Sequence, residues 1–98
     1  MFYKMDFERE NGVLKIGFGD PASNHQIVLE AAVIANGLEI DGTPILKING
    51  PASLPVAMVI AHSVCHRVGA VACYDPKLGQ YVVCISHNPS YSIGDLID

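Results

Sequence analysis

The expected fold rests on residues 45–62, ILKINGPASLPVAMVIAH, because this stretch predicts a strand, a turn and a helix in immediate succession. The strand covers residues 45–48, and the turn covers residues 49–51. The helix is expected over residues 52 to about 67, with Pro55 in its first turn, where a missing N–H costs little. A strand followed directly by a helix is half of the repeating unit of a parallel sheet.

The same order occurs once more, 30 residues earlier in the chain. A strand at residues 13–18 precedes a turn at residues 19–24 and a helix at residues 25–36. Both turns contain the tripeptide Pro-Ala-Ser, at residues 21–23 and again at residues 51–53. The sequence therefore predicts two strand–turn–helix units, each with the same helix start.

The flanking segments complete a single α/β domain of order ββαβαββ over residues 1–98. Residues 1–18 predict a hairpin with a type I′ turn at Asn11-Gly12. Residues 70–74 and 81–86 predict two further strands. The central strand–helix–strand–helix–strand order requires parallel pairing with right-handed crossovers. We expect a small mixed sheet with a parallel, Rossmann-like core in two or three layers; the alternative is a ferredoxin-like α+β sandwich.

The composition narrows the classes of partner. Half of the residues are hydrophobic and 16% are charged, so we expect part of the surface to be buried against a second subunit.

No apolar run reaches the roughly 18 residues of a membrane span, and no signal peptide pattern follows Met1. Cys65, Cys73 and Cys84 form no CxxC pair, which is typical of reduced, buried cysteines in a cytoplasmic protein. A net charge of −4 with six scattered Lys and Arg residues argues against a grip on long DNA or RNA.

Both Pro-Ala-Ser turns are expected beyond the carboxyl ends of parallel strands, where ligands bind in open α/β sheets. Each turn leaves free N–H groups at a helix N-terminus, equivalent to about half a positive charge. Gly50 would let a ligand approach the backbone. Two such turns side by side favour a small anion with more than one phosphate, although Pro and Ser also start helices with no ligand at all. The polar side chains expected at this site are Ser23, Asn24, Asn49 and Ser53.

Strand direction divides the other polar residues between the two ends of the sheet. Asp75 and Lys77 follow a parallel strand and are expected at the end that carries the turns. The second helix runs roughly 20 Å away from that end, at about 1.5 Å per residue, and so carries His66 to the opposite end. The last strand returns antiparallel, so His87 is expected beside His66, with His62 one helical turn away. Histidines serve as general acids, general bases or metal ligands, but His66 at a helix C-terminus is also favourable in itself.

Three segments carry a family resemblance: INGPASLPVA at residues 48–57, AHSVCH at residues 61–66, and GAVACYDPKLGQYVVCISHNPSYSIGDLID at residues 69–98. Together they resemble the small CRISPR-associated Csx-three family, also called ring nuclease three. The resemblance implies a distant member of the CARF (CRISPR-associated Rossmann fold) superfamily that forms homodimers. It also implies manganese-dependent cleavage of cyclic tetra-adenylate, the second messenger that activates ancillary nucleases in type III CRISPR systems.

Carried over by position, the resemblance implies that His66 is the best catalytic candidate, together with Asp75, Lys77 and His87. It also implies His66 and His87 as ligands for Mn²⁺. Lys77 stands where family members can have arginine, so the positive charge is kept but the bidentate grip on phosphate is lost. Because the turns and the histidines are expected at opposite ends, one subunit cannot close the site. We therefore expect a head-to-tail dimer of dimers around the ligand, with no role for DNA or membranes.

Two alternatives to cleavage stay open. The domain would act as a non-catalytic cyclic-oligoadenylate-binding module if the turns matter and His66 does not. It would act as a Mn²⁺-dependent exoribonuclease if short RNA tails enter the same phosphate site, although the negative net charge disfavours RNA.

Overall fold

The computed structural model describes all 98 residues and contains two helices and six strands in the expected order, with one short strand added at the end. The elements are β1 (Tyr3–Glu8), β2 (Val13–Phe18), α1 (Asn24–Asn36), β3 (Leu46–Asn49), α2 (Leu54–Val64), β4 (Ala70–Asp75), β5 (Gln80–Ser86) and β6 (Leu96–Ile97). α2 therefore ends three residues before the expected Arg67.

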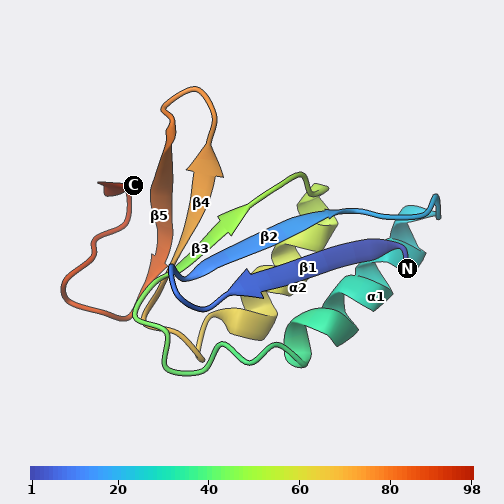
Figure 1. The fold of residues 1–98 in the computed structure, drawn as a ribbon, viewed down its shortest axis with the longest axis horizontal. Coiled ribbons are helices and arrows are strands. Elements are labelled where there is room, and N and C mark those ends of the chain that lie inside the picture. Colours follow the sequence, from blue (N-terminus) through green and yellow to red (C-terminus); the bar gives the residue numbers. More distant parts are fainter.

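The strands lie in the sheet in the order of the chain, β1-β2-β3-β4-β5-β6. β2, β3 and β4 are parallel, whereas β1, β5 and β6 pair antiparallel with their neighbours. Two right-handed crossovers that advance in the same direction place both helices on one face of the sheet, and Figure 1 shows α1 and α2 together behind it. The predicted mixed sheet with a parallel core is confirmed in two layers, and the ferredoxin-like alternative is wrong because β2, β3 and β4 are adjacent and parallel.

The main core lies between the two helices and the sheet. Twelve buried apolar residues form it, with Leu14, Leu46, Val56 and Ile60 among those that are almost fully covered. The helices supply their share of these residues at four-residue intervals, as in Val56, Ile60 and Val64 of α2. Both Pro-Ala-Ser turns lead into this layer, so the packing of the helices fixes where the turns lie.

A second, smaller core lies on the opposite face of the sheet, under the C-terminal segment. Ala72, Tyr81 and Val83 form it, and Tyr91 and Ile97 pack against them. The sequence prediction did not include β6, which has only two residues and was too short to produce a periodic pattern. The C-terminal segment therefore covers the outer part of the sheet that the helices leave open.

The turn of the β1–β2 hairpin differs from the expectation. β1 ends at Glu8 and β2 begins at Val13, so the loop has four residues instead of two. Among the residues of this loop only Gly12 has a positive φ, of 72°, and its N–H donates to the carbonyl of Glu8. The predicted type I′ turn is wrong because that turn needs a positive φ at both central residues, and Asn11 does not have one.

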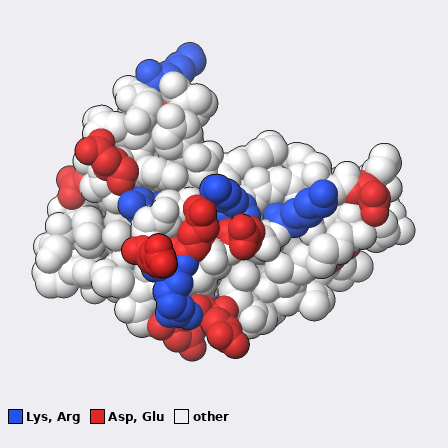
Figure 2. Space-filling view, in the orientation of Figure 1, with Lys and Arg blue, Asp and Glu red and all other residues white.

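The two faces of the molecule differ in charge. On the sheet face, acidic and basic side chains alternate, as in the pair Lys15 and Glu8, whose Nζ and Oε2 atoms lie 3.5 Å apart. Figure 2 shows Lys and Arg side by side with Asp and Glu over the middle of the molecule. The helices instead contain one charged residue, Glu30, whose carboxylate accepts a hydrogen bond from the N–H of Phe2. Large apolar side chains are exposed on the helix face, and these are Leu29, Val33, Leu54 and Met58.

Two further expectations concern the membrane and the cysteines. Neither helix has the length and hydrophobicity that crossing a bilayer requires. All three cysteines are free, as expected, but the expected burial is wrong for Cys73 and Cys84, which are exposed. They lie on β4 and β5 beyond the edge of α2, in the part of the sheet that no helix covers.

Candidate functional site

The two Pro-Ala-Ser turns meet at the carboxyl ends of β2 and β3. The hydroxyl of Ser53, in the second turn, donates a hydrogen bond to the side-chain oxygen of Asn24, at the start of α1, over 3.1 Å. This contact joins the N-termini of the two helices across 29 residues of sequence. We use the name cradle for the residues gathered at this end of the sheet, which are Ser23, Asn24, Asn49, Gly50 and Ser53.

Both serines also start their helices, as expected if the Pro-Ala-Ser turns serve only to begin a helix. Ser53 is the N-cap of α2, and its hydroxyl accepts a hydrogen bond from the N–H of Val56 over 3.3 Å. Ser23 is the N-cap of α1, where its N–H and its hydroxyl both donate to the side-chain oxygen of Gln26. Helix capping and ligand binding are therefore compatible here, because each helix still presents other N–H groups in its first turn.

Gly50 has a structural role that the sequence did not reveal. Its φ is 137°, and a Cβ at this position would overlap the carbonyl oxygen of Ile16 on β2. The expected role, access of a ligand to the backbone, stays a prediction. The close approach of β2 requires a glycine at this position.

Tyr3 fixes the second turn from the side of β1. The buried Tyr3 hydroxyl donates to the carbonyl of Pro51 over 2.6 Å. Burial raises the pKa of Tyr3 from 10.0 to about 12, because the charged form would lose its water. Together with Gly50, Tyr3 holds the second Pro-Ala-Ser turn rigidly against the first two strands.

Asp75 is the last residue of β4, and Lys77 lies in the loop that joins β4 to β5. The Asp75 carboxylate accepts hydrogen bonds from the backbone N–H groups of Lys77 and Leu78, over 2.9 and 3.3 Å, and so closes the hairpin. Neither residue is hydrogen-bonded to a Pro-Ala-Ser turn. The β4–β5 hairpin projects away from the helices (Figure 1), because twist separates the strand ends.

His66 and His87 come together at the opposite end of the sheet. Their ring centroids are 5.2 Å apart and their planes differ by 25°, so the rings are stacked. Both side chains are exposed, and neither makes a hydrogen bond within the chain. The expected proximity of these two residues, the histidine pair, is confirmed. His62 is exposed on α2 and is not part of the stack.

The backbone around the histidine pair is well anchored. His87 donates its N–H to the carbonyl of Gly69, and Gly69 donates its N–H to the carbonyl of Thr43. Arg67, directly after His66, donates to the carbonyls of Ala35, Leu38 and Ser63, which lie at the ends of both helices. Its Nε also lies 2.7 Å from Asp41. The backbone positions of the histidines are therefore fixed, whereas no hydrogen bond within the chain orients their rings.

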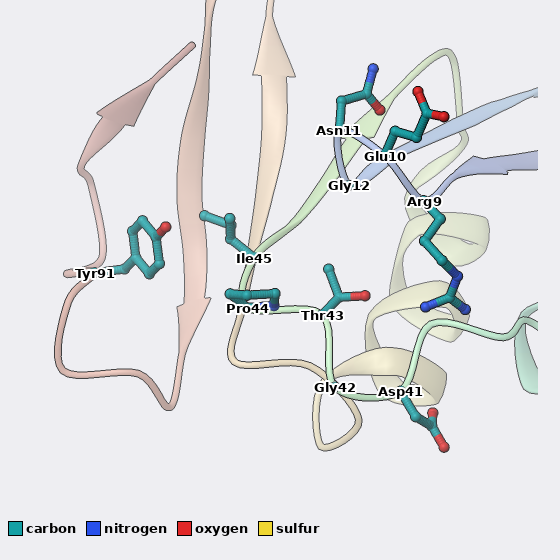
Figure 3. Close-up of a pocket in the computed structure, with 10 residues that line it drawn as sticks. All are labelled: Arg9, Glu10, Asn11, Gly12, Asp41, Gly42, Thr43, Pro44, Ile45 and Tyr91. Atoms are coloured by element: carbon teal, nitrogen blue, oxygen red, sulfur yellow. The ribbon is translucent and has the colours of Figure 1, made fainter.

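A polar hollow of about 400 Å³ opens at the same end as the histidine pair. Figure 3 shows Arg9, Asp41 and Thr43 around it, with Tyr91 on the side of the C-terminal segment. Tyr91 and His87 also border a second, shallower hollow of about 550 Å³. The sequence did not indicate these residues, because the loops that carry them are far apart in the chain and contain no motif.

The histidine pair does not fit a manganese ion within one chain. Mn²⁺ prefers carboxylate, carbonyl and water oxygens in octahedral geometry, and no group of three or more His, Cys, Asp or Glu residues converges anywhere in the molecule. The ligand set that the resemblance implies, His66 and His87, therefore needs groups from outside the chain.

Comparison with known proteins adds one finding about the family. A family model described as CRISPR-associated protein (Cas_csx3) matches residues 37–98. The match includes β3, α2, β4 and β5, and thus the second Pro-Ala-Ser turn, Asp75, Lys77 and the histidine pair. It does not include Ser23 and Asn24 of the first turn. No curated protein matches the chain.

Proposed function

Because the match covers more than half of the chain, the protein belongs to the Cas_csx3 family of CRISPR-associated proteins, and we propose that it binds cyclic tetra-adenylate and cleaves it to linear products. Such cleavage would switch off the ancillary effectors that the messenger activates. The observation that carries the proposal is the hydrogen bond between Ser53 and Asn24, which joins two helix N-termini into one cradle.

The cradle suits a small anion with several phosphates. Each helix N-terminus contributes about half a positive charge, and backbone N–H groups are ready donors to phosphate oxygens. The mixed charges on the sheet face and the net charge of −4 give no long basic surface. A compact cyclic tetranucleotide therefore fits the charge distribution better than a long nucleic acid does.

The histidine pair suits cleavage of an RNA phosphodiester by the adjacent ribose hydroxyl. One imidazole takes the proton of the 2′-OH while the 2′ oxygen attacks phosphorus, and the bond from phosphorus to the 5′ oxygen breaks. A protonated imidazole then gives its proton to the departing 5′ oxygen, which leaves a 2′,3′-cyclic phosphate and a 5′-OH. His66 and His87 take these acid and base roles, and Lys77 with the helix N-termini stabilises the charge on the phosphate.

One subunit does not bring the two halves together, so we propose a head-to-tail contact between dimers. The cradle and Lys77 of one dimer face the histidine pair of another, with the ligand between them. The uncharged helix face supports self-association, because four large apolar side chains on it are 64–77% exposed. The near two-fold symmetry of the ring suits a site across a dimer axis.

Manganese dependence remains a prediction from the resemblance. The acid–base step above uses only side chains of the protein. Cleavage rates in a chelator and in a Mn²⁺ titration would measure the contribution of the metal directly.

The deciding experiment incubates labelled cyclic tetra-adenylate with the protein and separates cyclic from linear products. We expect linear products with the wild type and a loss of about 10²–10⁴ in rate for His66→Ala, the range that general acid–base groups contribute. His62→Ala is the matched control, because His62 is also an exposed histidine near the end of α2 but lies outside the stack of His66 and His87. Equal rates for His66→Ala and the wild type would contradict the assignment.

A binding module without catalysis is the second candidate. The observation that favours it is the lack of any hydrogen bond to the ring of either His66 or His87, since catalytic histidines are usually oriented by a partner group. In this case labelled ligand would bind tightly and stay cyclic over hours. Variants of the cradle would weaken binding, and His66→Ala would have no effect.

A further inference from the structure

Cys73 and Cys84 lie on the same face of the β4–β5 hairpin. Cys73 is paired with Val82, and a bulge in the register at Val71 and Ala72 leaves Cys84 without a direct partner. The bulge gives β5 one extra residue, so that Cys84 and Ile85 both point toward the helix side of the sheet. Cys84 is two residues from Val82 and is therefore the diagonal neighbour of Cys73.

The thiol of Cys84 points back toward Cys73. Its Sγ donates a hydrogen bond to the carbonyl of Val82, the strand partner of Cys73, over 3.3 Å. Although Cys73 is exposed as a residue, its thiol is partly desolvated by apolar neighbours, and this desolvation together with the Cys84 thiol raises the pKa of Cys73 to about 12. Both cysteines are free and exposed, so a solute can reach them. Cys65, the third cysteine, is near the histidine pair on another element and donates to the carbonyl of His62.

The surroundings of the two thiols are apolar. Both cysteines line a groove of about 220 Å³ between α2 and the hairpin, where Ile48, Ala57 and Ile85 are among the other lining residues and no charged side chain is present. The nearest carboxylate along the chain, that of Asp75, is already bonded to the amides of its own turn. Hard ions such as Mn²⁺ would find no oxygen ligands there.

The two cysteines occupy diagonal positions on one face of the hairpin and line the same groove. Thiolates are soft ligands that select Cu(I)-class ions. A single ion of that class can be held by two neighbouring sulfurs.

We propose that Cys73 and Cys84 form a two-coordinate site for a soft, thiophilic metal ion of the Cu(I) class. On binding, each thiol loses its proton to solvent and each thiolate donates one electron pair to the ion, with no change of oxidation state. The resulting complex carries one negative charge and lies against the apolar groove, which Gly50 of the cradle also borders, and it includes neither residue of the histidine pair. Binding strengthens as the pH rises, because the ion competes with the thiol protons.

The test is an anaerobic titration of the protein with Cu(I) in competition with the chromophoric chelator bicinchoninate. We expect one tightly bound ion per wild-type chain and loss of that ion in both Cys73→Ser and Cys84→Ser. Cys65→Ser is the matched control and keeps the ion. X-ray absorption of the copper should report two sulfur ligands, and Mn²⁺ added in place of Cu(I) should leave the thiols unprotected against alkylation.

Three results would overturn the proposal. They are retention of the ion in either Cys73→Ser or Cys84→Ser, its loss in Cys65→Ser, and binding of no ion by the wild type. Circular dichroism of each serine variant separates a lost site from a lost fold.

Discussion

At the carboxyl ends of the parallel strands the polar side chains are joined by hydrogen bonds, whereas at the opposite end hydrogen bonds hold the backbone of the histidines but not their rings. At the cradle end, Ser53 is bonded to Asn24, and Tyr3 is bonded to Pro51 of the second turn. In the histidine pair, the only defined side-chain contact is the stack of His66 on His87. Under the proposed function, this difference would mean a preorganised binding end and a histidine end whose rings become oriented only with ligand or a second copy.

The largest expected effect is on the rate of ring opening, and it tests whether the cradle end of one molecule acts with the histidine pair of another. His66→Ala removes the acid–base group and Lys77→Ala removes phosphate stabilisation, so each should lower the rate of ring opening by about 10²-fold or more. A mixture of the two variants should recover part of the activity, because a cradle from one can face a histidine pair from the other. Product formation in the mixture is the measurement.

The control for this mixture is each variant mixed with itself at the same total concentration. Lys77 suits the experiment better than Asp75, because the Asp75 carboxylate closes the hairpin turn while Lys77 enters the turn only through its backbone N–H. If the mixture is as inactive as its components, the two halves do not meet across copies.

The second effect concerns the rigidity of the cradle end. Gly50→Ala would place a Cβ against the carbonyl of Ile16 at a φ that side chains rarely adopt, and should lower the free energy of unfolding by about 3 kcal/mol or more. Gly17→Ala is the control, because nothing lies within 4 Å of its Cβ, and should change stability by less than about 0.5 kcal/mol. Urea unfolding of both variants gives the comparison. A tolerated alanine at Gly50 would show that the second turn is not fixed by β2.

The third effect distinguishes the contribution of the Tyr3 hydroxyl to stability from that of the Tyr3 ring. Tyr3→Phe keeps the packing but leaves the carbonyl of Pro51 without its donor, at a cost of about 1–1.5 kcal/mol in the free energy of unfolding. The pKa of Tyr3 is about 12 in the fold against 10.0 in the reference state. The stabilisation is therefore complete below pH 10 and is lost as the pH rises toward 12.

The stability difference between wild type and Tyr3→Phe should thus shrink over that pH range. Denaturant unfolding at a series of pH values measures it. A difference that stays constant up to pH 12 would mean that the Tyr3 hydroxyl is not held in its neutral form by burial.

The smallest effect compares the two copies of Pro-Ala-Ser. Ser53→Ala removes the N-cap acceptor of Val56 and the contact with Asn24, at a cost of about 1 kcal/mol. Ser23→Ala removes a hydroxyl that is bonded to a side chain, that of Gln26, and should cost less than about 0.5 kcal/mol. Affinity for cyclic tetra-adenylate should fall more for Ser53→Ala. Equal losses in the two variants would mean that the identical tripeptides contribute equally.

Local patterns were sufficient to predict most of the elements and the placement of the histidines. The 3.6-residue period of α1 and α2 and the strand–helix order gave the parallel core, and strand direction alone brought His66 beside His87. The sequence predictions failed where the conformation of a few residues depends on neighbours that are distant in the chain. Asn11-Gly12 is typical of a two-residue turn, yet the hairpin adopts a four-residue loop.

Other features depend on contacts that no local pattern records. Gly50 is required by the carbonyl of Ile16, which is 34 residues away in the chain, and Arg67 joins the ends of both helices. The bulge in β5 turns Ile85 to the same side as Cys84, whereas strict alternation along an unbroken strand would place these two neighbouring residues on opposite faces.

The sequence by itself determined the order of elements, the direction of each strand and therefore the end of the sheet at which each polar residue lies. These properties follow from short-range periodicity and from the handedness of crossovers, which are nearly independent of detailed packing. Only the tertiary structure decided which residues at one end touch. Sheet twist carries Asp75 and Lys77 outward on their hairpin, while helix packing brings Asn24 and Ser53 into contact.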